Sequence, residues 1–299
     1  MKRYKKEGSN KLEIIQEFYA RRFVLTVDRS LCKGCAICKL ICPRYAISVM
    51  PATTGSDGCT LAPLIDIDEN KCDFHGICAV ACPFSAIKIS VDGIDELPAV
   101  SKGVFPVLTR DIEIDSSKCE PYCKKCEEKC PLEIISVKTA DETPQEPEGF
   151  AREAPPSQTV VDVKRELCAG CMVCWEACPT NALKVTKFIE GAISINNDLC
   201  PFGCSSCLEV CPVDALYLND TGKIGVSDTN CIYCGACENV CPKPQALKIE
   251  RTAIRHSPIE SGAWNKGLEK ITSTAALNKE LAAGRAAKAR SAAADLGVR

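Results

Sequence analysis

Cysteines at one repeated spacing are the residues of this sequence whose types could do chemistry. Three cysteines two residues apart and a fourth three residues later form the clearest run, Cys231-Ile-Tyr-Cys234-Gly-Ala-Cys237-Glu-Asn-Val-Cys241-Pro242. Gaps of two residues let a tight loop direct three thiolates at one cluster of iron and sulfide. The fourth cysteine is predicted to start a short helix and to reach a second cluster, while the proline prevents a regular helix from continuing. The run therefore predicts ligands for two [4Fe-4S] clusters.

The pattern recurs six times and accounts for 23 of the 24 cysteines. In chain order the predicted ligands are Cys32, Cys35, Cys38 and Cys42; Cys72, His75, Cys78 and Cys82; Cys119, Cys123, Cys126 and Cys130; Cys168, Cys171, Cys174 and Cys178; Cys200, Cys204, Cys207 and Cys211; and Cys231, Cys234, Cys237 and Cys241. Every run ends in Cys-Pro. Bacterial ferredoxins with two clusters use such runs in pairs, so six runs predict six [4Fe-4S] clusters in three tandem domains.

Three other uses of cysteine fit less well. Structural zinc takes pairs of ligands separated by a longer loop, whereas four ligands here lie within about a dozen residues. Disulfides are typical of secreted chains, and the residues after the basic start Met1–Lys6 contain no apolar signal segment. The third and fifth runs match the spacing of radical-SAM enzymes, but a barrel of about 200 residues does not follow either run. Iron–sulfur binding is the best interpretation.

Histidine replaces the second cysteine of the second run. His75 in register with a ligand position predicts an imidazole ligand, which would raise the reduction potential of its cluster. The alternatives are a [3Fe-4S] cluster with a vacant corner, or a [4Fe-4S] cluster completed by Cys59 from the preceding loop. With His75 as ligand, Cys59 is expected to be a free thiol. The other histidine, His256, has no metal-ligand neighbours in sequence and is expected to be structural.

Short alternating apolar segments predict the strands that position the runs. They are Phe23–Val27, Leu64–Ile67, Ile112–Ile114, Val160–Val163, Ala192–Ile195, Lys223–Val226 and Ala246–Ile249. After Cys-Pro most runs continue in Ala-Ile or Ala-Leu, where alanine permits close packing of the backbone on a cluster. The predicted fold class is α+β, with short antiparallel strand pairs, short helices and tandem two-[4Fe-4S] domains of the bacterial type.

The pairing of the runs decides the domain boundaries. The first and second runs predict a domain over 23–91, with Cys82 joining the first three cysteines of run one and Cys42 joining run two. The other four can pair consecutively, as 110–186 and 192–250, or in a nested way.

Glycine before the second cysteine in runs one and four, but not in runs two and six, favours nesting. In that arrangement 110–138 with 222–250 forms a split domain, 159–218 is inserted into it, and Cys130 joins Cys231, Cys234 and Cys237. Segments Met50–Asp57 and Thr139–Gln158 are predicted linkers.

The flanks of the repeats predict helices. Lys11–Ala20 has apolar residues on one helical face, which predicts an N-terminal helical extension over 1–22 that packs on the protein's own body. Trp264, Leu268 and Ile271 fall at helical spacing. The following residues are rich in alanine, lysine and arginine, so a C-terminal helical tail is predicted over 251–299.

Composition limits the partners. Aromatic residues make up only 5% and the net charge is -2. Each bound cluster with its thiolates adds roughly two negative charges, so the loaded protein would carry about -14 and should not bind nucleic acid generally. No stretch approaches the roughly 18 apolar residues of a membrane span. We therefore expect a soluble protein in a reducing cytoplasm.

No catalytic constellation is visible, because the sequence lacks a P-loop or dinucleotide fingerprint and has only two histidines. The clusters would transfer single electrons. The first hypothesis is an electron-transfer subunit, without a substrate site of its own, of a larger oxidoreductase. The alternatives are a free polyferredoxin carrier for a hydrogenase or heterodisulfide reductase, and a scaffold subunit.

The six runs over 32–242 resemble the polyferredoxins of methanogenic archaea. Flanking residues resemble one group most, the polyferredoxin subunits of formylmethanofuran dehydrogenase: Cys72-Asp-Phe-His-Gly-Ile-Cys78, Cys82-Pro83-Phe84, and Ser261-Gly-Ala-Trp264 within Ile254–Ser273. That group has more runs and cysteine at the position of His75. The resemblance implies electrons delivered in methanogenesis towards a metal-pterin subunit that reduces carbon dioxide. It also implies contact with a further ferredoxin-like subunit and a heterodisulfide reductase-type electron donor.

Overall fold

The computed structural model describes residues 2–54, 60–95, 97–138 and 159–283. The predicted linker Thr139–Gln158 and Cys59 lie outside these residues, as does the tail after residue 283. Within the described ranges, no helix is long and apolar enough to cross a lipid bilayer.

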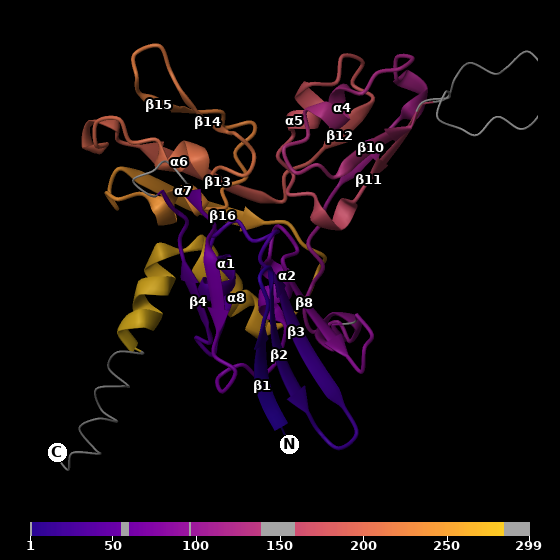
Figure 1. Cartoon of the computed structure of the whole chain (residues 1–299), viewed down its shortest axis with the longest axis vertical. Helices are drawn as coiled ribbons and strands as arrows, with labels where there is room; N and C mark the ends of the chain where they lie inside the picture. The colour runs from indigo at the N-terminus through magenta and orange to yellow at the C-terminus, as the bar shows by residue number, and fades with distance from the viewer. Residues whose placement is uncertain (1, 55–59, 96, 139–158, 284–299) are drawn as a thin grey trace, which may run out of the picture.

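Short antiparallel strand pairs divide the chain into three units (Figure 1). In unit 1, β3 (Arg22–Asp28) pairs with β8 (Ile87–Val91), and β4 (Ile47–Met50) pairs with β7 (Leu64–Ile67). In unit 2, β9 (Ile112–Ile114) pairs with β12 (Leu183–Val185), and β10 (Ile135–Lys138) pairs with β11 (Val160–Val163). In unit 3, β13 (Ile189–Ile195) pairs with β16 (Leu247–Ile254), and β14 (Leu216–Leu218) pairs with β15 (Ile224–Val226). All seven predicted strands are present.

A short helix contains the third ligand position of every run and ends before the fourth. These helices are α1 (Ile37–Ile41), α2 (Ile77–Ala81), α4 (Lys125–Glu128), α5 (Val173–Glu176), α6 (Ser206–Glu209) and α7 (Ala236–Val240). The prediction that the fourth cysteine starts a helix is wrong. Cys42, for example, follows α1 with φ -66° and ψ 115°, because a residue before proline is driven into extended backbone.

The connections hold the remaining short elements. They are β5 (Thr53–Thr54), β6 (Thr60–Leu61), α3 (Pro98–Ser101) and the one-turn 3-10 helices Ser116–Lys118, Arg165–Leu167 and Asn197–Leu199. β5 and β6 pair with each other, so part of the predicted linker Met50–Asp57 is a strand.

The favoured nested arrangement, with 110–138 and 222–250 in one split domain, is wrong. The strand pairings join run three with run four and run five with run six, which is the consecutive alternative. The glycine criterion failed because it reports backbone conformation rather than domain order. Gly170 has φ +73° and its missing Cβ would lie 3.2 Å from the carbonyl oxygen of Thr186, but Tyr233 also has positive φ, +50°, at the equivalent position.

The predicted N-terminal helical extension over 1–22 is also wrong. Strands β1 (Lys2–Glu7) and β2 (Lys11–Glu17) form a hairpin that adds to unit 1, giving a sheet of order β1-β2-β3-β8. Leu12 and Ile14 are fully buried and pack with Leu25 and Val27 of β3. A central strand is covered on both faces, so its apolar residues need not alternate, and this imitates a helical pattern.

The C-terminal helix prediction is confirmed in part. β16 extends to Ile254, so the first residues of the predicted tail are strand. Helix α8 (Gly262–Thr272) follows, and 274–283 is helical as well. Trp264 has 0% of its surface exposed, and its Nε1 donates to His256 Nε2 at 3.1 Å. His256 is therefore structural, as predicted.

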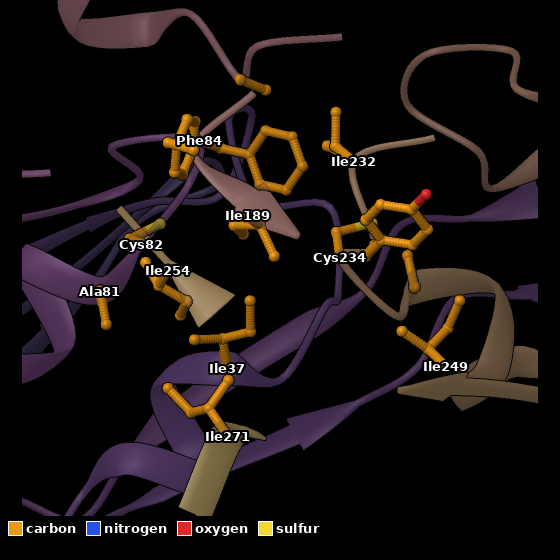
Figure 2. Close-up of a cluster of buried hydrophobic side chains, with 14 of the residues drawn as sticks. Ile37, Ala81, Cys82, Phe84, Ile189, Ile232, Cys234, Ile249, Ile254 and Ile271 are labelled. Atoms are coloured by element: carbon orange, nitrogen blue, oxygen red, sulfur yellow. The ribbon is translucent and has the colours of Figure 1, made fainter. Parts of the chain in front are cut away.

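The three units share a central core. In Figure 1, unit 1 occupies the lower half, and units 2 and 3 lie apart at the upper right and upper left. Figure 2 shows the core where they meet: Ile37, Cys82 and Phe84 of unit 1 face Ile189, Ile232 and Cys234 of unit 3, with Ile271 of α8 beside them. Ala169 and Cys171 bring unit 2 into the same core. Cysteines of the second, fourth and sixth runs thus meet at the centre of the molecule.

Candidate iron–sulfur cluster sites

The backbone around the second ligand position explains how each run wraps around one point. In the runs with two-residue gaps, residues on both sides of this position have left-handed backbone. The pairs are Gly34 and Ala36, Phe74 and Gly76, Gly170 and Met172, and Tyr233 and Gly235. In the two runs with a longer gap, only Tyr122 and Gly203 before it are left-handed. The reversals turn successive side chains towards the inside of the loop.

The structure assembles the predicted ligand residues into six groups of four, each with three residues of one run and the fourth of its partner. Three inner groups face another unit: Cys32, Cys35, Cys38 and Cys82 (inner group 1); Cys168, Cys171, Cys174 and Cys130 (inner group 2); Cys231, Cys234, Cys237 and Cys211 (inner group 3). Three outer groups lie at the far ends: Cys72, His75, Cys78 and Cys42 (outer group 1); Cys119, Cys123, Cys126 and Cys178 (outer group 2); Cys200, Cys204, Cys207 and Cys241 (outer group 3).

Cavities confirm four of these groupings directly. The four residues of inner groups 2 and 3 and of outer groups 1 and 2 each line a single cavity. In the other two, Cys82 interacts electrostatically with Cys32 and Cys38, and Cys241 with Cys200. The structure places Cys82 beside run one and Cys42 beside run two, as the predicted exchange of the fourth ligand in unit 1 requires. The nested prediction for Cys130 is wrong, since Cys130 lies with inner group 2.

Burial and crowding raise the pKa of most of these thiols. Burial raises the pKa of Cys171 to about 11 and that of Cys174 to about 12, and the neighbouring cysteines add to both shifts. Thiolates packed this closely would repel one another without a cation between them. Iron binds thiolates and releases their protons, so the groups fit a positively charged iron centre that holds the cysteines deprotonated.

The size of the groups argues against a single ion. Within the described ranges, no three cysteine, histidine or carboxylate side chains are placed to hold one metal ion. A four-iron cluster is a larger body, and its ligands surround a space rather than a point. The arrangement thus fits clusters better than the zinc alternative.

In three runs the alanine four residues after the last cysteine supplies a hydrogen bond that the sequence pattern did not predict. The amides of Ala86, Ala182 and Ala215 donate to the sulfur of the fourth cysteine of their runs at 3.3, 3.2 and 3.3 Å. Burial works to raise the pKa of Cys178, yet hydrogen bonds with the amides of Thr180 and Ala182 lower it overall. Such bonds to sulfur are one of the factors that set the potential of a cluster.

His75 lies where its run predicts a ligand. It lines the same cavity as Cys42, Cys72 and Cys78, and 27% of its side chain is exposed. Its Nε2 is buried without a hydrogen-bond partner, and its Nδ1 lies 3.4 Å from Oδ1 of Asp73. Burial lowers the pKa of His75, which favours the neutral ring that binds metal. A carboxylate beside Nδ1 and a free Nε2 are typical of a metal-ligating histidine.

The outer groups differ in their exposure. All four cysteines of outer groups 2 and 3 are partly exposed. In outer group 1, Cys42, Cys72 and Cys78 are buried and share a core with Leu12 and Ile14 of the β2 strand. The added hairpin thus helps to cover outer group 1, while the other two are accessible from the surface.

Comparisons with known proteins give the same assignment for part of the chain. Models described as "4Fe-4S dicluster domain" match residues 167–215 and 199–245, and one described as "4Fe-4S binding domain" matches residues 25–48. A ferredoxin of Methanothermococcus thermolithotrophicus is 31% identical over 77 residues, which cover 25% of this chain and 98% of that ferredoxin. The chain belongs to the 4Fe-4S ferredoxin family.

Longer proteins are also similar to this chain, over part of it or nearly all of it. The polyferredoxin protein MvhB of Methanothermobacter marburgensis is 30% identical over 107 residues, 34% of this chain. The chain spans 25% of the length of MvhB and 34% of that of an NADH-quinone oxidoreductase subunit I from Pelobacter propionicus. A solved chain in the formate dehydrogenase–heterodisulfide reductase–formylmethanofuran dehydrogenase complex of Methanospirillum hungatei is similar over nearly the whole length. Its TM-score is 0.78 with 32% identity, and 91% of each chain is covered. The chain is thus polyferredoxin-like, with tandem ferredoxin domains.

Proposed function

We propose that this chain is the electron-transfer subunit of a larger oxidoreductase and holds six [4Fe-4S] clusters, one in each inner and outer group. The observation that carries the proposal is the assembly of 23 cysteines and His75 into six groups of four. When bound, such clusters supply one-electron transfer. The chain's own residues supply the thiolates, the amide hydrogens to sulfur and the apolar cover.

For outer group 1, we propose that His75 Nε2 is the fourth ligand. The atom is buried and lacks a hydrogen-bond partner, and it lies in a residue that lines the cavity with three cysteines. An unpaired buried nitrogen costs free energy, which coordination to iron would recover. Asp73 would then orient the ring from the Nδ1 side.

For the partners, we propose a complex that resembles the one from Methanospirillum hungatei. The match over 91% of both chains supports this, because a freely diffusing ferredoxin would need neither the β1–β2 hairpin nor the α8 helix that surround the repeats. In this proposal, the chain connects a heterodisulfide reductase-type donor to a formylmethanofuran dehydrogenase-type metal-pterin subunit in the reducing cytoplasm of a methanogen. It carries out no carbon chemistry itself.

The proposal is tested on protein purified without oxygen from its native cells. We expect about 24 iron and 24 sulfide per chain, since a [4Fe-4S] cluster contains four of each. We also expect the chain to elute in a large assembly with dehydrogenase activity. Zinc in place of iron would refute cluster binding. Elution as a free monomer with full iron content would instead favour the second candidate, a polyferredoxin carrier, which the exposed outer groups 2 and 3 also suit.

A further inference from the structure

Three cations lie where inner groups of different units meet, one at each junction. Arg110 lies between units 1 and 2, Lys187 between units 2 and 3, and Arg251 between units 1 and 3. They are not ligands, and they occur outside the cysteine runs. Their positions give them a role in the cluster environment that the repeats alone do not provide.

Arg110 contacts the backbone of ligand cysteines from two units. Its Nη1 donates to the carbonyl oxygen of Cys168, and its Nη2 donates to that of Cys82 at 3.4 Å. The guanidinium carbon lies 5.0 Å from the centre of the Phe188 ring. Burial lowers the pKa of Arg110, and Cys168 and Cys82 oppose this more strongly than Glu166 does. The positive charge is therefore directed mainly at inner groups 1 and 2.

Lys187 occupies the equivalent place between units 2 and 3. Its Nζ donates to the carbonyl oxygen of Asp228 and lies 5.0 Å from the centre of the Tyr233 ring. Burial lowers the pKa of Lys187, whereas Cys231 of inner group 3, the carboxylates of Asp228 and Glu176, and Cys171 of inner group 2 act to raise it, in that order. The ammonium group thus faces thiols of both units together with two carboxylates.

Arg251 of β16 closes the third junction and is the most buried of the three, with 8% of its surface exposed. Its Nε donates to the carbonyl oxygen of Tyr233 at 2.8 Å, and its Nη2 donates to that of Cys234. The same group lies beside inner group 1, because a Cβ on Gly235 would lie 2.5 Å from Nη2 of Arg251 and 3.8 Å from the carbonyl oxygen of Cys35. The guanidinium therefore acts on inner groups 1 and 3 together.

Two of the outer groups have a different environment. Outer group 2 has a cation close by, since Lys125 lines its cavity together with Glu120, but Lys125 is exposed. All eight cysteines of outer groups 2 and 3 are partly exposed. Solvent therefore screens the charges around these two groups.

We infer that Arg110, Lys187 and Arg251 raise the reduction potentials of the inner clusters above those of outer groups 2 and 3. The inference rests on the proposed function. Reduction adds one negative charge to a cluster, and a cation in partly desolvated surroundings stabilises that charge more strongly than one in water does. Each cation serves two inner groups, so the centre of the molecule is where an electron is held most stably.

The test is an anaerobic redox titration of the whole, cluster-loaded chain, followed by electron paramagnetic resonance. Each of three variants should affect two of the six clusters: Arg110→Gln, Lys187→Gln and Arg251→Gln. At a fixed applied potential, the ratio of reduced to oxidised cluster should fall about tenfold for those two. A tenfold change corresponds to about 59 mV for a one-electron couple. The lowest-potential signals, from outer groups 2 and 3, should not move.

Arg255→Gln is the matched control, because Arg255 is exposed and paired with Glu190 at 3.2 Å. Arg110→Lys keeps the charge and should restore most of the wild-type potential. Equal shifts in Arg110→Lys and Arg110→Gln would overturn the inference in favour of a packing role, as would unchanged potentials in all three glutamine variants. If Arg110→Gln fails to fold, the half-buried Lys187 gives the same test. Wild-type protein without iron and sulfide would refute the proposed function instead.

Discussion

Replacing His75 by cysteine should lower the potential of one cluster and leave the other five unchanged. Substitution changes a neutral nitrogen ligand into a thiolate, which adds negative charge beside the iron. In Rieske centres two histidines in place of two cysteines raise the potential by about 250 mV or more over plant-type ferredoxins. A single exchange in outer group 1, whose cysteines are buried, should therefore shift its potential by on the order of 100 mV.

An anaerobic redox titration with electron paramagnetic resonance measures this shift directly. Asp73→Asn tests the same site without changing a ligand, because the carboxylate 3.4 Å from Nδ1 of His75 increases the basicity of the ring. Its loss should raise the potential slightly, opposite to the effect of His75→Cys. Cys59→Ser is the control for the competing ligand and should change neither the iron content nor any potential.

Two results would refute the reasoning. An unchanged potential in His75→Cys, together with loss of one cluster in Cys59→Ser, would make Cys59 the fourth ligand. A full-strength three-iron signal in the wild-type protein would show that neither side chain binds the fourth iron. In that case the buried Nε2 of His75 would have to be satisfied by water.

Three further predictions test the pairing, the C-terminal helix and its pH dependence. Cys130→Ser should remove the cluster of inner group 2 and leave inner group 3 intact, as measured by iron content and spin quantitation; loss of inner group 3 instead would restore nesting. Gly267→Ala should destabilise the protein by about 1–3 kcal/mol in thermal unfolding, because the new Cβ would lie 2.7 Å from Ile41, whereas Gly262→Ala meets nothing within 4 Å and should have little effect. The pKa of Glu280 is lowered from 4.5: burial acts to raise it, but hydrogen bonding with Lys270 outweighs burial. The ion pair is therefore lost only as the pH falls below about 4.5, and amide hydrogen exchange in 274–283 should increase there and not between pH 5 and 8.

The sequence predicted iron–sulfur binding because ligand spacing is a local property. A loop of two-residue gaps can present its cysteines in few ways, so the six runs were recognisable without tertiary information. Five of the six strands that follow Cys-Pro were missed. β4, β8, β10, β12 and β14 begin directly after the alanine or aliphatic pair, which is too short a segment for a periodicity to be visible.

The pairing of runs and the N-terminal hairpin could not be predicted from the sequence, for a different physical reason. Both depend on contacts between segments far apart in the chain, such as Lys5 with Asp66 at 2.6 Å and Arg3 with the carbonyl oxygen of Glu69 at 2.8 Å. Polar contacts of this kind leave no periodic pattern. The Gly8–Asn10 turn between β1 and β2 is a local signal for a hairpin, which the helical interpretation of Lys11–Ala20 did not use.

The irregularities of the repeat follow from the position of each run in the fold. The regular runs one, four and six supply the inner groups, whose loops are pressed against other parts of the chain. A Cβ on Gly235 would lie 2.5 Å from Nη2 of Arg251, and Ile232 is 3% exposed, so an inserted residue would have no room. The irregular runs two, three and five supply the outer groups.

In the outer groups, the residues that lengthen the first gap of runs three and five face solvent. Nothing lies within 4 Å of a Cβ on Gly203, and Tyr122 and Phe202 are exposed. Close packing at the centre thus restricts the inner loops to one length, while the outer loops are free to vary in length and, at His75, in ligand. Since a cluster exchanges electrons with a partner only where the partner can approach it, the variation lies at the ends of the molecule where partners would have to be distinguished.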